Sequence, residues 1–91
     1  MQDGVTMHLP ETIFIDSQVE FIGECEIEPN VVIKGKTKIT SSIIKAGTVI
    51  EDSIIENSTI GVMAHIRPNS IIKNSKIGNF VEVKKSNLEG V

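Results

Sequence analysis

The fold is decided by the stretch at residues 37–60, TKITSSIIKAGTVIEDSIIENSTI. An isoleucine returns there every five or six residues, at Ile39, Ile44, Ile50, Ile55 and Ile60. A serine or threonine stands two positions before each of them, at Thr37, Ser42, Thr48, Ser53 and Ser58. Side chains of a strand alternate between two faces, so residues two apart share a face. Each unit is therefore predicted to send one small and one large side chain to the same side.

The same pattern runs through most of the chain. Large apolar markers stand at Ile15, Phe21, Ile27, Ile33, Ile39, Ile44, Ile50, Ile55, Ile60, Ile66, Ile72, Ile77, Val83 and Leu88. The thirteen gaps between them are eight of six residues and five of five, and a small or β-branched residue precedes every marker after the first by two positions. A fixed short period of this kind is typical of a solenoid.

A unit this short holds one strand and one corner. Gly and Asn, which tolerate positive φ, fall where the corners are expected, at Asn30, Gly35, Gly47, Asn57, Asn69, Asn74 and Asn79. Three units close a triangular coil, so successive coils begin at Ile15, Ile33, Ile50, Ile66 and Val83. The sequence thus predicts an all-β fold, a parallel β-helix of a little over four triangular coils at residues 15–91, with an entry segment at residues 1–14.

Composition excludes several classes of protein. Ile and Val supply 25 residues but Ala and Leu only two each, which disfavours helices. No apolar run approaches the roughly 20 residues of a membrane span, and a net charge of -3 argues against nucleic acid as a partner. Cys25 occupies an inward slot and is expected to be a core thiol, consistent with a reducing cytosol. His8 and His65 are spaced unlike a metal site, and His65 is expected on the surface without a partner carboxylate.

Charge is distributed unevenly along the chain. Residues 1–33 hold seven acids and no base, whereas residues 34–91 hold five acids and nine bases. The outward residue after each coil start gives a column of Asp16, Lys34, Glu51, Arg67 and Lys84. Arg67 and Lys84 would stack as like charges about 4.8 Å apart, a repulsion of roughly 1 kcal/mol in water that an anion between them would relieve. Glu82 and Asn79 are candidates to orient Lys84.

Four segments carry a resemblance to a known family. They are GVTM at 4–7, IEPN at 27–30, AHIRP at 64–68 and above all IGNFVEVKK at 77–85. They resemble the bacterial bifunctional N-acetylglucosamine-1-phosphate uridyltransferase / glucosamine-1-phosphate acetyltransferase, a member of the hexapeptide-repeat transferases. The crossover rule for parallel strands favours right-handed connections, but the resemblance implies left-handed coils. Val62 and Met63 depart from the family's usual Pro-Phe, and only a local change is expected there.

The resemblance implies a function for a larger enzyme. That enzyme transfers acetyl from acetyl-CoA to glucosamine 1-phosphate and then uridylyl from UTP, in the cytoplasm, as a homotrimer on the way to UDP-N-acetylglucosamine for the cell envelope. The motifs imply that Arg67 and Lys84 bind the sugar phosphate. The chain is expected to be the start of the β-helix, without the magnesium-dependent uridyltransferase domain, the acetyl-CoA site or the catalytic histidine, which would lie beyond Val91. It is therefore expected to be inactive alone and to hold no cofactor or metal.

One other function remains open at this point, and a second is disfavoured. A structural or trimerisation module without catalysis is the main alternative, because open coil ends present strand edges that invite association. A γ-class carbonic anhydrase would need three zinc-binding histidines, and the chain has two.

Overall fold

The computed structural model describes residues 4–90 and consists of fifteen short strands arranged in three sheets. Sheet A contains β1 (Val5–Met7), β4 (Cys25–Ile27), β7 (Ile43–Ile44), β10 (Thr59–Ile60) and β13 (Lys76–Ile77). Sheet B contains β2 (Phe14–Ile15), β5 (Val32–Lys34), β8 (Val49–Glu51), β11 (His65–Ile66) and β14 (Glu82–Val83). Sheet C contains β3 (Glu20–Ile22), β6 (Lys38–Thr40), β9 (Ile54–Glu56), β12 (Ile71–Lys73) and β15 (Asn87–Glu89). A single turn of 3-10 helix, η1 (Pro10–Thr12), precedes β2.

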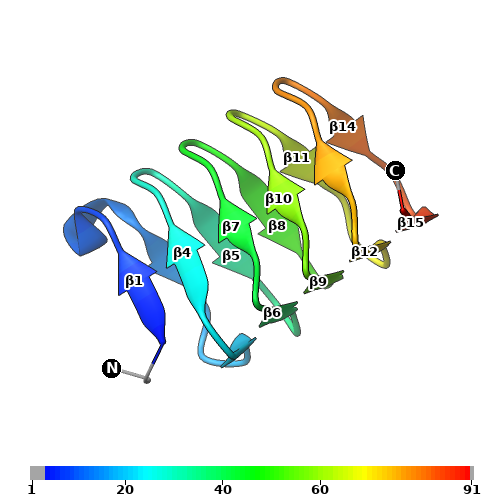
Figure 1. Ribbon diagram of the computed structural model, residues 1–91. Helices are drawn as coiled ribbons and strands as arrows, with labels where there is room; N and C mark the ends of the chain where they lie inside the picture. Colours follow the sequence, from blue (N-terminus) through cyan, green and yellow to red (C-terminus); the bar gives the residue numbers. More distant parts are fainter. Residues whose placement is uncertain (1–3, 91) are drawn as a thin grey trace.

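Three consecutive strands, one from each sheet, make one coil of a solenoid. Coil 1 is β1 to β3 and coil 5 is β13 to β15, and every strand pairs in parallel with its counterparts in the adjacent coils (Figure 1). The register places marker on marker, as in the pairing of Ile39 with Ile55 and of Ile55 with Ile72. The prediction of a parallel β-helix is confirmed.

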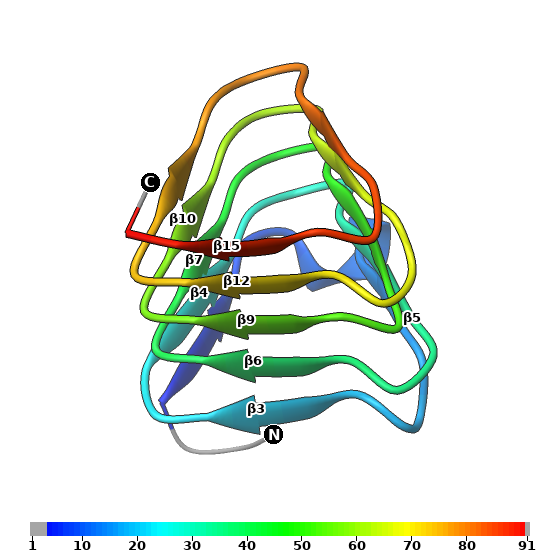
Figure 2. The same ribbon diagram turned by 90° about the vertical axis from the view of Figure 1, so that its right-hand side faces the viewer.

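The hand of the solenoid follows from the view along its axis. In Figure 2, where coil 5 is nearest the viewer, the chain climbs sheet A on the left, crosses the top, descends sheet B on the right and returns along sheet C at the bottom. It turns clockwise as it approaches the viewer, which is a left-handed winding. The left hand implied by the family resemblance is therefore present, against the general preference for right-handed crossovers.

The interior is a stack of isoleucines flanked by small residues. Nine isoleucines have no exposed surface: Ile27, Ile33, Ile39, Ile44, Ile50, Ile55, Ile60, Ile66 and Ile72. Buried serines and threonines fill the small positions, and some of their hydroxyls link the coils, since Ser42 Oγ accepts the N–H of Ser58 and Ser58 Oγ accepts the N–H of Ser75, each at 3.1 Å. Cys25 is 3% exposed, as expected of a core thiol.

The corners hold residues with positive φ. Six of the predicted corner residues have it: Asn30, Gly35, Gly47, Asn57, Asn69 and Asn74. Asn79 does not, because the left-handed conformation falls on its neighbour Phe80, with φ of 59°. Met63, one coil below, has φ of 57° at the same corner between sheets A and B. This corner therefore carries two bulky side chains in a conformation that such residues rarely adopt.

The stacking begins earlier in the chain than the repeat indicated. β1 pairs with β4 in full register, Val5 with Cys25 and Met7 with Ile27, so residues 5–7 are already part of the solenoid. The boundary predicted between residues 14 and 15 is corrected accordingly, and each sheet has five strands where a little over four coils were predicted. The periodic search missed this strand because residues 8–14, which include η1, interrupt the hexad spacing.

Candidate functional site

Arg67 and Lys84 lie side by side on the outer surface of sheet B. Each directly follows a strand of this sheet, Arg67 after β11 and Lys84 after β14. The pairing of Ile66 with Val83 sets the two cations at equivalent positions of coils 4 and 5, and the Arg67 N–H donates to Val83 O at 2.8 Å. Both residues are exposed, because the inward positions beside them belong to Ile66 and Val83. The predicted juxtaposition is therefore present.

Glu82 joins the two cations through its carboxylate. Its Oε2 accepts a hydrogen bond from Arg67 Nη1 at 3.2 Å, and its Oε1 lies 4.0 Å from Lys84 Nζ. Alternation along β14 explains the position, since Glu82 and Lys84 point outward on either side of the inward Val83. Glu82 lies diagonal to Arg67 and relieves the like-charge contact with Lys84. A comparison of equivalent positions on successive coils does not reveal this, because it pairs Arg67 with Lys84 alone.

These ion pairs are weak because they are exposed to solvent. The side chains of Arg67, Glu82 and Lys84 are 47%, 43% and 74% exposed. Exposed pairs of this kind contribute about 0 to 1 kcal/mol each. The guanidinium and ammonium groups are therefore held near one another but remain available to a stronger anion. A planar guanidinium beside a flexible ammonium suits the oxygens of a phosphate.

His65 lies on the same face, two residues before Arg67. Its Nε2 is 3.7 Å from Glu51 Oε1, too far for a hydrogen bond, and is shielded from solvent without a hydrogen-bond partner among residues 4–90. Glu51 is therefore close to His65 but is not hydrogen-bonded to it, and the His65 side chain is 42% exposed, as expected of a surface residue. His8 lies on sheet A instead, with Nε2 2.8 Å from Glu26 Oε2. Across the described part of the chain, no three His, Cys, Asp or Glu residues gather to hold a metal ion.

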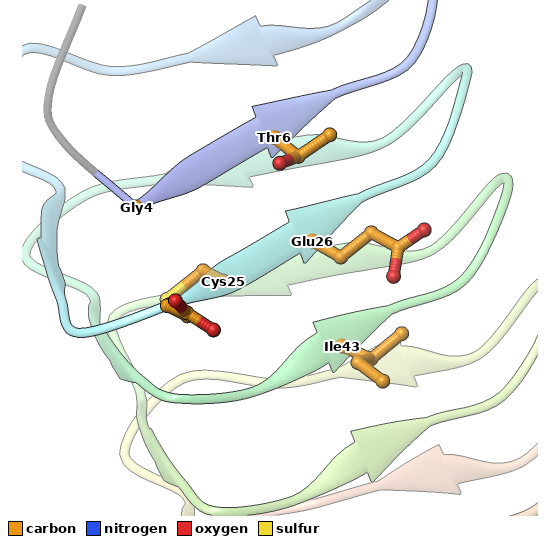
Figure 3. A pocket seen from close by; sticks show the side chains of 6 residues that line it. Gly4, Thr6, Cys25, Glu26 and Ile43 are labelled. Atoms are coloured by element: carbon orange, nitrogen blue, oxygen red, sulfur yellow. The ribbon is translucent and has the colours of Figure 1, made fainter.

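Two hollows of the surface lie elsewhere. One of about 370 Å³ covers the start of sheet A and is lined by Gly4, Thr6, Glu24, Cys25, Glu26 and Ile43 (Figure 3). Two glutamates and no cation line it, so its charge opposes an anionic ligand. The Cys25 thiol donates into the protein, to Ile22 O and Ile39 O at 3.6 Å. This hollow lies along strands β1, β4 and β7 of sheet A and carries none of the predicted site residues.

Comparisons with known proteins agree with the motifs. No family model matches the chain. Three curated proteins described as "Bifunctional protein GlmU", from Campylobacter curvus, Nitratiruptor sp. and Campylobacter lari, are 63%, 60% and 57% identical to it. The chain is homologous to a segment of GlmU. Each alignment covers 91 residues, which is 100% of this chain and 21% of the GlmU protein.

The solved structures support the fold. The N-terminal domain of CcmM, determined in complex with CcmN, superimposes with a TM-score of 0.81 over 93% of this chain and 90% of that one. Its sequence is 21% identical, so the likeness concerns the β-helix alone. Among residues 4–90 no helix is long and apolar enough to cross a membrane. Sequence identity over the whole chain thus relates this protein to GlmU, and the structure itself shows the β-helix.

Proposed function

We propose that this chain is the first part of the acetyltransferase β-helix of a bifunctional enzyme that makes UDP-N-acetylglucosamine. The proposal is supported by 57 to 63% identity to GlmU proteins over all 91 residues. Because the chain spans about a fifth of those relatives, the activity belongs to the whole protein. In that protein the segment supplies the scaffold and part of the binding site for glucosamine 1-phosphate, and alone it is inactive.

The residues proposed to bind the sugar phosphate are Arg67 and Lys84. The observation that carries this step is their stacking on adjacent coils with one carboxylate between them. Arg67 offers two parallel N–H donors to phosphate oxygens, and Lys84 adds a point charge on a flexible stem. The phosphate fixed by this pair anchors the sugar so that its amine faces the acetyl donor.

The remaining chemistry is proposed to come from other parts of the protein. Acetyl-CoA is the co-substrate, and its thioester is attacked by the sugar amine with help from a general base. The family's catalytic histidine is the proposed base, supplied by another part of the whole enzyme. Magnesium is proposed to serve the uridylyl transfer in another part of the whole protein. This chain's own contribution is to bind and orient the phosphate.

The test is acetyl transfer by the full-length enzyme with Arg67→Ala. We expect the Michaelis constant for glucosamine 1-phosphate to rise more than tenfold, because a charge-assisted bidentate contact is lost. Lys76→Ala is the matched control: Lys76 is exposed on β13 of the same coil as Lys84, but on sheet A. An Arg67→Ala enzyme with an unchanged Michaelis constant and turnover would contradict the site.

A second role, as a trimerisation module, is favoured by one observation. Phe80 and Met63 are 76% and 55% exposed and lie on adjacent coils at the corner between sheets A and B. Exposed apolar side chains that cluster in this way mark contact surfaces. We propose that the enzyme is a homotrimer in the cytoplasm and that this corner takes part in its contacts. Sedimentation of the Phe80→Ser enzyme tests this, since a trimer of undiminished stability would exclude the corner.

A further inference from the structure

The carboxylate of Glu82 occupies the place where the proposed site expects an anion. One oxygen faces Arg67 Nη1 at 3.2 Å and the other faces Lys84 Nζ at 4.0 Å, so a single group engages both cations. Glu82 belongs to β14 itself and cannot diffuse away from them. In the absence of ligand the site is therefore already filled by a singly charged anion from the chain.

We propose that Glu82 is a resident counter-ion that a phosphate monoester must displace, and that it thereby excludes singly charged anions from the site. The inference rests on the proposed function, in which Arg67 and Lys84 bind the sugar phosphate. It adds a specificity-determining residue to that site, one that makes no attractive contact with the ligand.

The selectivity follows from comparing the anion that enters the site with the Glu82 carboxylate that it displaces. Acetate, another carboxylate or chloride carries a single negative charge. It would neutralise Arg67 and Lys84 no better than the Glu82 carboxylate already does. Such a monoanion must also compete with a tethered group, whose effective concentration is in the millimolar range or higher. A phosphate monoester carries about -1.5 to -2 charges at pH 7 and three acceptor oxygens, so it gains contacts that one carboxylate cannot supply.

The environment of Glu82 allows the exchange. Its side chain is 43% exposed, so the carboxylate can swing into solvent and be hydrated when the phosphate arrives. Its ion pairs with the two cations are solvent-exposed and weak, so breaking them costs little free energy. A buried ion pair would instead lock the cations and would bar every ligand. The position next to the site, combined with exposure, suits a group that is displaced.

The experiment measures binding to the full-length enzyme by calorimetry, because Glu82 could also affect turnover. Glu82→Gln keeps the size of the side chain and removes its charge. We expect its dissociation constant for glucosamine 1-phosphate to fall at least threefold. We also expect added sodium acetate or chloride to compete with the sugar phosphate more than tenfold better than in the wild type. Glu56→Gln, the same charge change on sheet C, is the control and should alter neither quantity.

Three variants separate this inference from the proposed function. Arg67→Ala defines which part of the binding belongs to this site. If Arg67→Ala leaves the dissociation constant unchanged, the proposed site itself is wrong. If Arg67→Ala weakens binding but Glu82→Gln binds the sugar phosphate no more tightly, or resists acetate as the wild type does, only the role of Glu82 is overturned. Glu82→Ala must change binding in the same direction as Glu82→Gln, because the proposal depends on the charge alone.

Discussion

The side-chain oxygen of Asn79 accepts a hydrogen bond from the backbone N–H of Val62, 2.8 Å away on the coil below. This bond ties coil 5 to coil 4 at the corner between sheets A and B. The same corner is tied between coils 2 and 3 by Glu28, whose Oε1 accepts the N–H of Ala46 at 3.0 Å. Side-chain acceptors thus satisfy corner N–H groups that the strand pairing leaves over.

Replacing Asn79 tests the value of this tie. We expect Asn79→Ala to lower the free energy of unfolding by about 1 kcal/mol, because the Val62 N–H loses its acceptor. Asn79→Asp keeps an oxygen in the same position and should retain most of the stability. Urea denaturation followed by circular dichroism measures both. Equal losses for alanine and aspartate would show that the acceptor has no role.

Gly61 and Gly78 offer a matched pair for testing how closely the coils approach. A Cβ added at Gly61 would lie 2.6 Å from the backbone carbon and oxygen of Gly78, whereas one at Gly78 would meet only Val81 Cγ2 at 3.7 Å. Neither glycine has positive φ, so crowding alone distinguishes them. We expect Gly61→Ala to destabilise the protein by more than about 2 kcal/mol and Gly78→Ala to change it by less than about 0.5 kcal/mol. Comparable melting temperatures for the two variants would refute this account of coil spacing.

The parts of the fold that follow from alternation could be predicted from the sequence. A large aliphatic residue two positions after a small or β-branched residue has one way to be buried in a short strand, and the buried markers from Ile27 to Val83 follow that rule. Asn and Gly at corners were predictable for a similar reason, since their backbones reach positive φ at low cost. The hand was not, because either winding buries the same residues, and only the family resemblance indicated the left one.

The contacts within the site depend on which neighbour on the adjacent coil each side chain reaches, and the sequence repeat does not determine this. Arg67 has two outward neighbours on coil 5, the equivalent Lys84 and the diagonal Glu82, and its side chain is long enough to turn to the opposite charge. Phe80 takes the corner conformation in place of Asn79, so that the amide of Asn79 is free to reach Val62. Both outcomes come from side-chain reach across coils, which a comparison of equivalent positions misses.

The neighbours Ile54 and Ile55 test which face carries the stability. Ile55 is fully buried between Ile39 and Ile72, while Ile54 points outward on the same strand and is only half-buried. We expect Ile55→Ala to cost about 2 to 5 kcal/mol, the range for a large-to-small change that leaves a cavity, and Ile54→Ala to cost less than half as much. Urea midpoints of the two variants measure the difference. A larger loss at Ile54 would mean that the outward face of sheet C is covered in solution.

Phe80 allows the cost of the corner conformation to be measured. Its φ of 59° is sterically unfavourable for an aromatic residue, and its side chain is 76% exposed, so packing recovers little of that cost. Asparagine tolerates this region, as Asn30 does at the same corner three coils earlier. We therefore expect Phe80→Asn to raise the free energy of unfolding of the dissociated subunit by about 0.5 to 1 kcal/mol, a magnitude typical of relieving backbone strain.

Phe80→Ala is the control, because it removes the same aromatic ring without introducing a residue suited to positive φ. Its melting temperature should stay close to that of the wild type and below that of Phe80→Asn. If asparagine and alanine behave alike, the conformation carries no measurable strain. If both variants are less stable than the wild type, the exposed ring is packed against something in solution, and the corner of Phe80 and Met63 is then a contact surface that evolution keeps at the expense of local strain.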